Sequence, residues 1–311
     1  MPLRTGRAPR SPLAALTPYA VNVRNGRSWT AIVRVGDGAH ARISGLTVSG
    51  PVPCGTVSGV TAVQAASLEL TDAPVRDIHP VTSACGGQRN VGVQFGTPPW
   101  IEIDGVGGST ADGRVSHVVI DNFLSEGVEV VGPPDGQPSR VKLADSTITA
   151  GSPQLPTEQF GIVILFAAVA QITGNTISGG VCNFEGCGPD PIFEFPAMGV
   201  FIEEAAVGST VTDNHISGSD VGVYQYGSPN CCTISGNTLQ DNRFFGIVIQ
   251  DSDGTTSENA ISGGQIGIGV VAGGADTVAV LQGDKIKQTS VASVKEIECC
   301  GFTATAIIKD H

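Results

Sequence analysis

The sequence ITGNTIS at residues 172–178 returns three more times, as VTDNHIS at 211–217, ISGNTLQ at 234–240 and TSENAIS at 256–262. Each copy has an apolar residue or threonine, two further residues, asparagine, one residue and then an aliphatic residue. Self-similarity of this kind is the sequence signature of a solenoid built from stacked repeats. Weaker copies place other residues at the asparagine position, namely Leu46, Ala73, Asn122, Ser146 and Asp284.

A glycine-led apolar segment precedes most of these copies. Its versions are GIVIL (161–165), GVFIE (199–203), GVYQY (222–226), GIVIQ (246–250) and GIGVV (267–271), and in the four clear cases the glycine leads the asparagine by 14, 15, 15 and 13 residues. Earlier versions begin at Ala31, Gly59, Gly92 and Gly127, which makes nine coils. A period of 22–24 residues suits three short strands and three corners. We therefore predict an all-β, right-handed parallel β-helix.

The repeat also predicts the inside of the solenoid. One corner forces a residue toward the left-handed backbone region, which asparagine tolerates, and stacked asparagine side chains can hydrogen-bond from coil to coil. Strand alternation gives the inward positions. Gln225 interrupts the inward row and is interpreted as a hydrogen-bonded polar core residue. The residues expected to point inward are Ile162, Val200, Val223, Ile247 and Ile268, with Ile164, Ile202, Ile249 and Val270 two positions further on.

The extent of the repeat and the composition on either side of it predict three parts in the 311 residues. These are a poorly ordered leader (1–28), the β-helix (29–286) and a C-terminal cap over the last coil (287–311). A net charge of −12 disfavours nucleic acid and anionic lipid as partners, because the only basic run is Arg4, Arg7 and Arg10 in the leader. No apolar stretch is long enough for a membrane span, and no signal peptide is present as the chain stands. Oligomerisation stays open.

Eight cysteines bear on the compartment. An even number in loops favours disulfides and a secreted or cell-surface location, while reduced thiols stay an alternative. Cys182 and Cys187 flank a short loop and are expected to pair. Zinc-ligand spacing is missing, and the stretch Asp251-Ser-Asp253-Gly254 lacks the downstream ligands of a calcium loop. We therefore predict no metal site and no cofactor.

The Gly-Ile strand followed by Ile-x-Gly-Asn-x-Ile resembles the pectin-lyase-like β-helix superfamily, and the units resemble parallel β-helix repeats. The resemblance covers about residues 29–286. It implies a groove along the outer face of the glycine-led strands, walled by corner insertions. It does not select an activity, because the superfamily includes lyases, glycosidases, epimerases, esterases and non-catalytic proteins. Motifs of pectate lyases, polygalacturonases and mannuronan epimerases are absent from this sequence.

The middle coils carry the candidate binding residues. Two insertions, 150–159 and 181–197, enter just before a groove strand and are expected to overhang it. Tyr224 and Tyr226 offer flat rings for stacking against sugars, although shielding of the sheet is an alternative. Asp220 and Arg243 lie near one corner and also suit an ordinary salt bridge. The predicted substrate-binding residues are Phe201, Tyr224, Tyr226, Gln250, Glu129, Asp220 and Arg243.

Three carboxylates are the candidate acid and base. Glu204 and Asp251 occupy equivalent positions two coils apart, about 9.6 Å at a rung spacing of about 4.8 Å, and Glu203 adjoins Glu204. That separation approaches the roughly 6.5–9.5 Å of an inverting glycosidase pair. Solvated acids at strand ends are the alternative. We therefore expect a carbohydrate-active protein, a hydrolase acting on a neutral or weakly charged polysaccharide or oligosaccharide; the alternatives are a non-catalytic binder of glycan or protein, or a polysaccharide lyase or epimerase.

Overall fold

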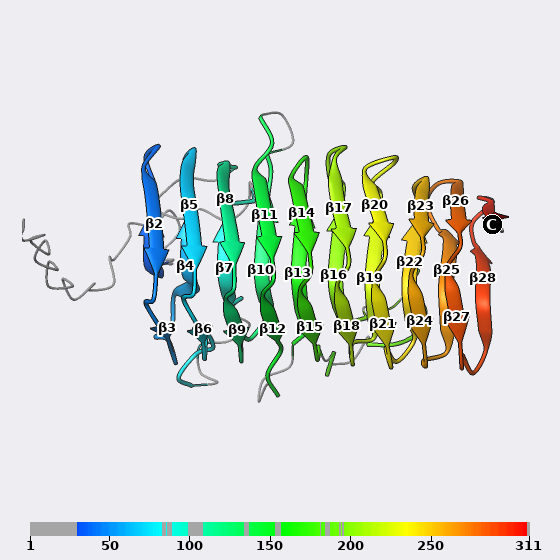
Figure 1. The fold of residues 1–311 in the computed structure, drawn as a ribbon, viewed down its shortest axis with the longest axis horizontal. Helices are drawn as coiled ribbons and strands as arrows, with labels where there is room; N and C mark the ends of the chain where they lie inside the picture. The colour runs from blue at the N-terminus through cyan, green and yellow to red at the C-terminus, as the bar shows by residue number, and fades with distance from the viewer. Residues whose placement is uncertain are drawn as a thin grey trace, which may run out of the picture.

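The computed structural model shows a ladder of short strands that runs from one end of the molecule to the other (Figure 1). It describes residues 30–82, 85, 89–98, 108–133, 137–152, 157–180, 182, 183, 187–192, 194 and 196–309. The leader expected at 1–28 lies outside the described residues. No helix long and apolar enough to cross a membrane occurs in the part of the chain that is described.

Three parallel sheets make up the ladder, and the chain visits them in turn. Sheet A contains β1 (Thr30–Val35), β4 (Thr56–Ala62), β7 (Val91–Phe95), β10 (Glu126–Val131), β13 (Phe160–Leu165), β16 (Met198–Glu203), β19 (Val221–Tyr226), β22 (Phe245–Gln250), β25 (Ile266–Ala272) and β28 (Ala292–Glu298). Sheet B contains β2 (His40–Ser44), β5 (Ala66–Thr71), β8 (Ala111–Ser116), β11 (Arg140–Ala144), β14 (Val169–Thr173), β17 (Ser209–Thr212), β20 (Cys232–Ser235), β23 (Gly254–Ser257), β26 (Thr277–Gln282) and β29 (Ala304–Lys309).

Sheet C completes each coil with a strand of two or three residues. Coil 1 is β1 to β3, coil 2 is β4 to β6, and the count continues to coil 9; within the described ranges, coil 10 adds strands to sheets A and B alone. The parallel β-helix is confirmed. The strands of sheet C are β3 (Val48–Ser49), β6 (Val75–Arg76), β9 (Val119–Asp121), β12 (Thr147–Thr149), β15 (Thr176–Ser178), β18 (His215–Ser217), β21 (Thr238–Gln240), β24 (Ala260–Ser262) and β27 (Lys285–Lys287).

The core is a stack of aliphatic layers. All nine residues expected to point inward are fully buried and belong to one cluster that runs the length of the helix. The leading glycine of each coil has a steric reason. A Cβ at Gly127 would collide with the backbone oxygen of Gly161 in the next coil and with Ile148 of sheet C. A Cβ at Gly161, Gly199, Gly222 or Gly246 would meet the equivalent two neighbours: the backbone oxygen of the leading glycine in the next coil and an isoleucine or leucine of sheet C. The glycines therefore let sheets A and C approach closely.

The asparagines form the expected ladder. Asn175, Asn214 and Asn237 each donate Nδ2–H to the Oδ1 of the asparagine in the following coil, at 2.9–3.0 Å, and Asn259 donates to Asp284 in the same way. The conformational reason given for them is wrong. The left-handed backbone belongs to the residue before each asparagine, for example Gly174 (φ 67°) and Asp213 (φ 57°). Asparagine is used for its side-chain amide.

One weak repeat is misaligned. Ile120 pairs with Ile148, so the residue of coil 3 that stacks on Ser146 of coil 4 is Val118. The assignment of Asn122 to this position is therefore wrong by four residues. Asn122 instead donates to Asp77 across coils at 2.7 Å. Gln225 behaves as interpreted: it is fully buried, and its Nε2 donates to the backbone oxygens of Ser228 and Asp253.

All eight cysteines are in disulfides. Cys54 pairs with Cys85, and Cys182 pairs with Cys187 as expected. The other two disulfides join sequence neighbours, Cys231 with Cys232 and Cys299 with Cys300. Disulfides persist in oxidising compartments, so this pairing is consistent with a protein that works outside the cytoplasm.

The C-terminal segment continues sheets A and B beyond coil 9. Val294 and Phe302 pack against the end of the core, and Ile297 packs on the outer face, whereas Val291 and Ile307 are exposed. Glu296 replaces the inward aliphatic residue of the preceding coil and accepts a backbone N–H from Ala306 at 2.7 Å. Charged groups at a sheet edge oppose further strand addition. That residues 287–311 act as a cap stays a prediction.

Candidate functional site

The outer face of sheet A brings the middle-coil residues together as predicted. Phe201 of β16 pairs with Tyr224 of β19, and their rings meet edge to face with centroids 5.7 Å apart. Two positions further along the strands, Glu203 pairs with Tyr226, and Tyr226 pairs with Gln250 of β22. Five predicted site residues thus come from three neighbouring coils, although 49 positions separate the first and last of them in the chain.

The described residues of the second insertion in this region, 187–192, 194, 196 and 197, form a covering segment that borders a pocket on this face. The Tyr224 hydroxyl donates to the backbone oxygen of Pro191 at 3.0 Å and to Oε1 of Gln250, so it ties the segment to the sheet. The pocket has a volume of about 290 Å³. Its lining residues are Pro191, Ile192, Glu194, Pro196, Met198, Phe201, Glu203, Tyr224, Tyr226 and Gln250. We call it the sheet A pocket.

The two predicted insertions hold each other in place beside the pocket. Thr157 donates its backbone N–H to Oδ1 of Asn183 at 2.7 Å, and the backbone N–H of Asn183 donates to the oxygen of Thr157 at 3.2 Å. Glu158 forms a bridge with Cys182, whose disulfide to Cys187 closes the short loop. The second insertion therefore reaches the outer face of sheet A as a braced segment.

Glu203 is the predicted carboxylate that faces the pocket. It is half-buried, and no described residue donates a hydrogen bond to its carboxylate. Burial, and then the neighbouring charge of Glu204, raise the pKa of Glu203 above its ordinary value. The side chain is thus able to hold a proton at a higher pH than an exposed glutamate.

Tyr224 and Tyr226 differ in access. Tyr224 is 5% exposed beneath the covering segment, whereas Tyr226 and Phe201 keep half-buried rings at the pocket. Burial and the nearby carboxylate of Asp251 raise the pKa of both tyrosines, so their hydroxyls stay protonated. Tyr224 holds the covering segment against the sheet, and Tyr226 is the tyrosine that a ligand can reach.

Glu204 and Asp251 lie at equivalent strand ends but do not line the pocket. Glu204 is exposed at the corner after β16. The Oδ1 of Asp251 accepts backbone N–H groups from Gly273, Gly274 and Ala275 at 2.7–3.1 Å. Asp251 therefore anchors the corner of the next coil. The proposed pairing of Glu204 with Asp251 stays a prediction that the pocket geometry does not support.

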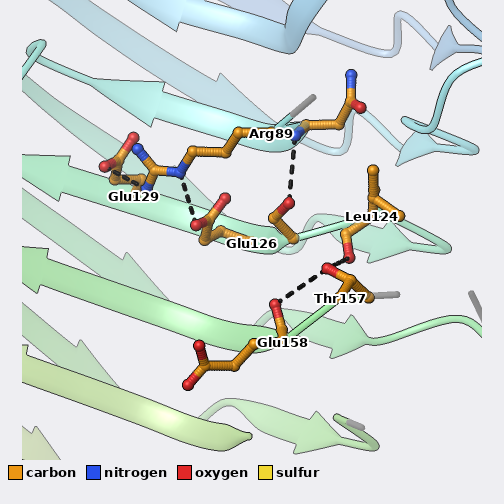
Figure 2. A network of polar contacts seen from close by, with 8 residues as sticks. Arg89, Leu124, Glu126, Glu129, Thr157 and Glu158 are labelled. Carbon is orange, nitrogen blue, oxygen red and sulfur yellow. Dashed lines mark hydrogen bonds and ion pairs between the residues drawn. The ribbon is translucent and has the colours of Figure 1, made fainter. Parts of the chain in front are cut away.

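Glu129 does not offer the surface contact expected of it. It is fully buried, and its Oε1 lies 2.6 Å from Nη2 of Arg89, while Nε of Arg89 lies 2.7 Å from Oε1 of Glu126 (Figure 2). Burial alone would lower the pKa of Arg89, but the two carboxylates outweigh it and raise the pKa, so the guanidinium stays charged. Arg89 precedes β7 in an irregular corner, and no repeat signal identifies it.

Glu158 lies close to this network, two residues before β13. Figure 2 shows its side chain directed away from Arg89. Burial, followed by the charges of Glu126 and Asp220, raises the pKa of Glu158 to about 8. Glu158 is therefore mostly protonated at neutral pH. Glu158 was not identified from the sequence, because the residue lies in an insertion outside the repeat.

Asp220 and Arg243 form the salt bridge that the sequence allowed. Nε of Arg243 lies 2.7 Å from Oδ1 of Asp220, and Oδ2 of Asp220 accepts the backbone N–H of Ala197 at 3.0 Å. Asp220 is 5% exposed at its side chain and Arg243 is 55% exposed. The pair supports the base of the covering segment, and neither residue lines the sheet A pocket.

Comparison with known proteins agrees with the fold. The model of the family described as "Periplasmic copper-binding protein (NosD)" matches residues 145–287. A solved mutant of the periplasmic alginate epimerase AlgG is similar at 12% identity and a TM-score of 0.47, covering 94% of this chain and 80% of that chain. The enzymatically active domain of bacteriophage CBA120 tailspike protein 2 is similar at 13% identity and a TM-score of 0.44, covering 89% of this chain and 41% of that chain.

The three stacked parallel sheets define the class: the chain is a parallel β-helix protein. Within it, the segment that matches the NosD family model covers β12 to β27, including the strands that carry the sheet A pocket. No curated protein matches the chain in sequence. At these identities the structural likenesses concern the fold alone.

Proposed function

We propose that this protein is a carbohydrate-binding β-helix protein that takes one sugar unit of a neutral glycan into the sheet A pocket. One observation carries the proposal: two accessible aromatic rings, two carboxyl groups and an amide converge on a single small cavity. Sugar recognition needs this combination, since rings cover the apolar face of a sugar and polar groups pair with its hydroxyls.

Each lining group has a task in this proposal. Phe201 and Tyr226 offer ring surface to the sugar. Glu203 and Gln250 offer hydrogen-bonding groups at the strand ends. The raised pKa of Glu203 lets the carboxyl donate as well as accept when it is protonated.

The size of the cavity limits what it holds. Ligand pockets span roughly 300–1,000 Å³, and the sheet A pocket has about 290 Å³. This volume favours a single terminal or branching sugar over several consecutive units. The long groove implied by the superfamily resemblance is replaced here by a covered pocket.

A hydrolase is the second candidate, and one observation favours it. Glu194 and Glu203 line the same pocket from two different elements: Glu194 is on the covering segment and Glu203 is on β16. In such a reaction Glu203 would give its proton to the glycosidic oxygen as the bond to the anomeric carbon breaks. Glu194, as a carboxylate, would take a proton from the water that attacks that carbon. Asp251 has no part in this scheme.

Copper binding, suggested by the family description, does not fit the donors of the matched segment. Copper sites use imidazole, thiolate or thioether ligands. Residues 145–287 contain one histidine, His215, and one methionine, Met198, and their four cysteines are in disulfides. His215 lies on sheet C and Met198 on the outer face of sheet A. Among the described residues no group of three or more His, Cys, Asp or Glu is arranged to hold a metal ion.

The disulfides support a place of action outside the cytoplasm. Four pairings, one of them (Cys182–Cys187) within the second insertion, would be lost in a reducing compartment. We therefore extend the proposal to a secreted or cell-surface protein whose partner is an extracellular or envelope glycan.

A glycan panel tests both candidates. Binding and product release are measured for the wild type, for the pocket variants Glu203→Gln and Glu194→Gln, for the strand-end variants Glu204→Gln and Asp251→Asn, and for the distant exposed control Glu258→Gln. A binder loses about tenfold in affinity with Glu203→Gln and releases no product. A hydrolase loses product with either pocket variant. Loss with Glu204→Gln or Asp251→Asn, but not with Glu203→Gln, would place the site at the strand ends and contradict the pocket.

A further inference from the structure

A second candidate site lies on the outer face of sheet B, in coils 1–5. The register aligns Arg42, Glu69, Arg114, Lys142 and Gln171 in one row across β2, β5, β8, β11 and β14. Arg140 lies beside this row, two positions before Lys142. The residues are far apart in sequence because coils 2–5 contain insertions. The absence of a basic run in the helix therefore gave no hint of this row.

Apart from Arg42, these side chains border an open groove. Its volume is about 580 Å³, twice that of the sheet A pocket. We call it the sheet B groove. Its lining residues are Ser67, Leu68, Glu69, Asp112, Gly113, Arg114, Arg140, Val141, Lys142, Val169 and Gln171.

The acids of the groove already have partners, and three cations do not. Glu69 pairs with Arg42 at 2.6 Å, and Oδ1 of Asp112 accepts the backbone N–H of Arg140 at 2.8 Å. Arg114, Arg140 and Lys142 are exposed and make no ion pair within the described chain. On a chain of net charge −12, three unpaired cations on two adjacent strands form a local site of opposite sign.

We propose that the sheet B groove binds a linear acidic glycan through its carboxylate or sulfate groups. Guanidinium groups pair with such oxyanions through two parallel hydrogen bonds, and a lysine adds a point charge. Cations on neighbouring rungs are spaced by about 4.8 Å, so they face a ligand whose charges repeat along a chain. Ser67 and Gln171 add uncharged hydrogen-bonding groups for hydroxyls.

The lining disfavours the other polyanions. Single-stranded nucleic acid is held by stacking of bases on aromatic side chains, and no aromatic residue is among the described residues that line the groove. Anionic membranes are bound by basic surfaces that also present apolar side chains for insertion. The exposed large apolar residues, such as Val207 and Ile308, lie outside this groove.

The test uses the full-length protein and defined probes. Affinity is measured for an oligogalacturonate, for dextran sulfate and for neutral dextran. The variant Arg114→Glu/Lys142→Glu reverses two groove charges. The matched control Lys285→Glu/Lys287→Glu makes the same charge change at exposed positions of β27 on sheet C.

The groove variant is expected to lose about tenfold or more in affinity for the acidic probes, while the control stays within about twofold. Binding should weaken with added salt, and neutral dextran should not bind. Equal losses in both double variants, no binding of either acidic probe, or tighter binding of oligothymidylate or anionic vesicles would each overturn the proposal. Tyr226→Ala should leave acidic-probe binding intact, so this site and the sheet A pocket can fail separately.

Discussion

Coils 3–5 and coils 6–8 place polar side chains on the same outer face of sheet A but use them differently. In coils 3–5, Arg89 seals Glu126 and Glu129 into a buried ion network. In coils 6–8, Glu203 of β16 and Tyr226 of β19 occupy a column of the same sheet two positions further along the strands than Glu129, yet they border a cavity. Strand position thus determines which way a side chain points, and the covering segment determines whether a ligand can reach it.

The largest effect should come from breaking the buried network. Arg89→Met leaves two carboxylates in a dry site without a cation, and such a change costs about 3–5 kcal/mol. Urea unfolding at neutral pH measures the loss. Arg243→Met is the matched control: Arg243 also pairs with a carboxylate but is 55% exposed, and its removal should cost about 1 kcal/mol or less. Equal losses of unfolding free energy in the two variants would contradict the claim that the buried network contributes more to stability than the exposed Arg243 pair.

A smaller effect, dependent on pH, is expected at Glu158. Its pKa of about 8 in the folded state exceeds the ordinary value of 4.5, so the folded protein holds a proton that the unfolded chain has released. Stability therefore falls as the pH rises from about 4.5 to 8. Glu158→Gln removes this penalty and should raise the free energy of unfolding by about 1–3 kcal/mol at pH 9, with little change near pH 4. A constant difference across this range would contradict the assigned pKa.

Asp251→Ala should have a moderate effect on stability and little on binding. The substitution removes the acceptor of three backbone N–H groups at the coil 9 corner, at a cost of about 1–3 kcal/mol. Thermal unfolding and glycan affinity are measured on the same samples. A loss of affinity without a loss of stability would return Asp251 to the functional site.

The smallest effect on stability belongs to Tyr226. Because the ring is half-buried, Tyr226→Ala should lower the free energy of unfolding by about 1 kcal/mol or less, while glycan affinity falls by about tenfold. Tyr226→Phe keeps the ring and should retain most of the binding. If the phenylalanine variant loses as much as the alanine variant, stacking is not the main interaction.

The sequence predicted the fold and the strand faces because the repeat is regular between residues 161 and 271. Asn175, Asn214 and Asn237 mark one corner, and residues such as Phe201 and Tyr224 follow from alternation. The earlier coils have insertions of different lengths. In those coils the repeat alignment was wrong at Asn122. The constant repeat length could not predict the row that joins Arg42, Arg114 and Lys142, because the number of residues between its members varies.

The rest of the site depends on segments outside the repeat. Glu194 and Pro191 reach the pocket through the second insertion, and Arg89 reaches Glu129 from an irregular corner. The periodicity of the repeat does not predict where such inserted segments contact the sheet. Burial was misjudged for the same reason: Glu129 points outward as expected, but it is covered and paired.

The central claim is that the sheet A pocket holds a sugar, and a crystal structure with the best neutral oligosaccharide of the panel tests it most directly. We predict electron density for one sugar ring between Tyr226 and the covering segment, with a hydroxyl of the sugar within hydrogen-bonding distance of the Glu203 carboxyl group. Density for the sugar on another face, or a closed pocket with the ligand bound elsewhere, would contradict the account.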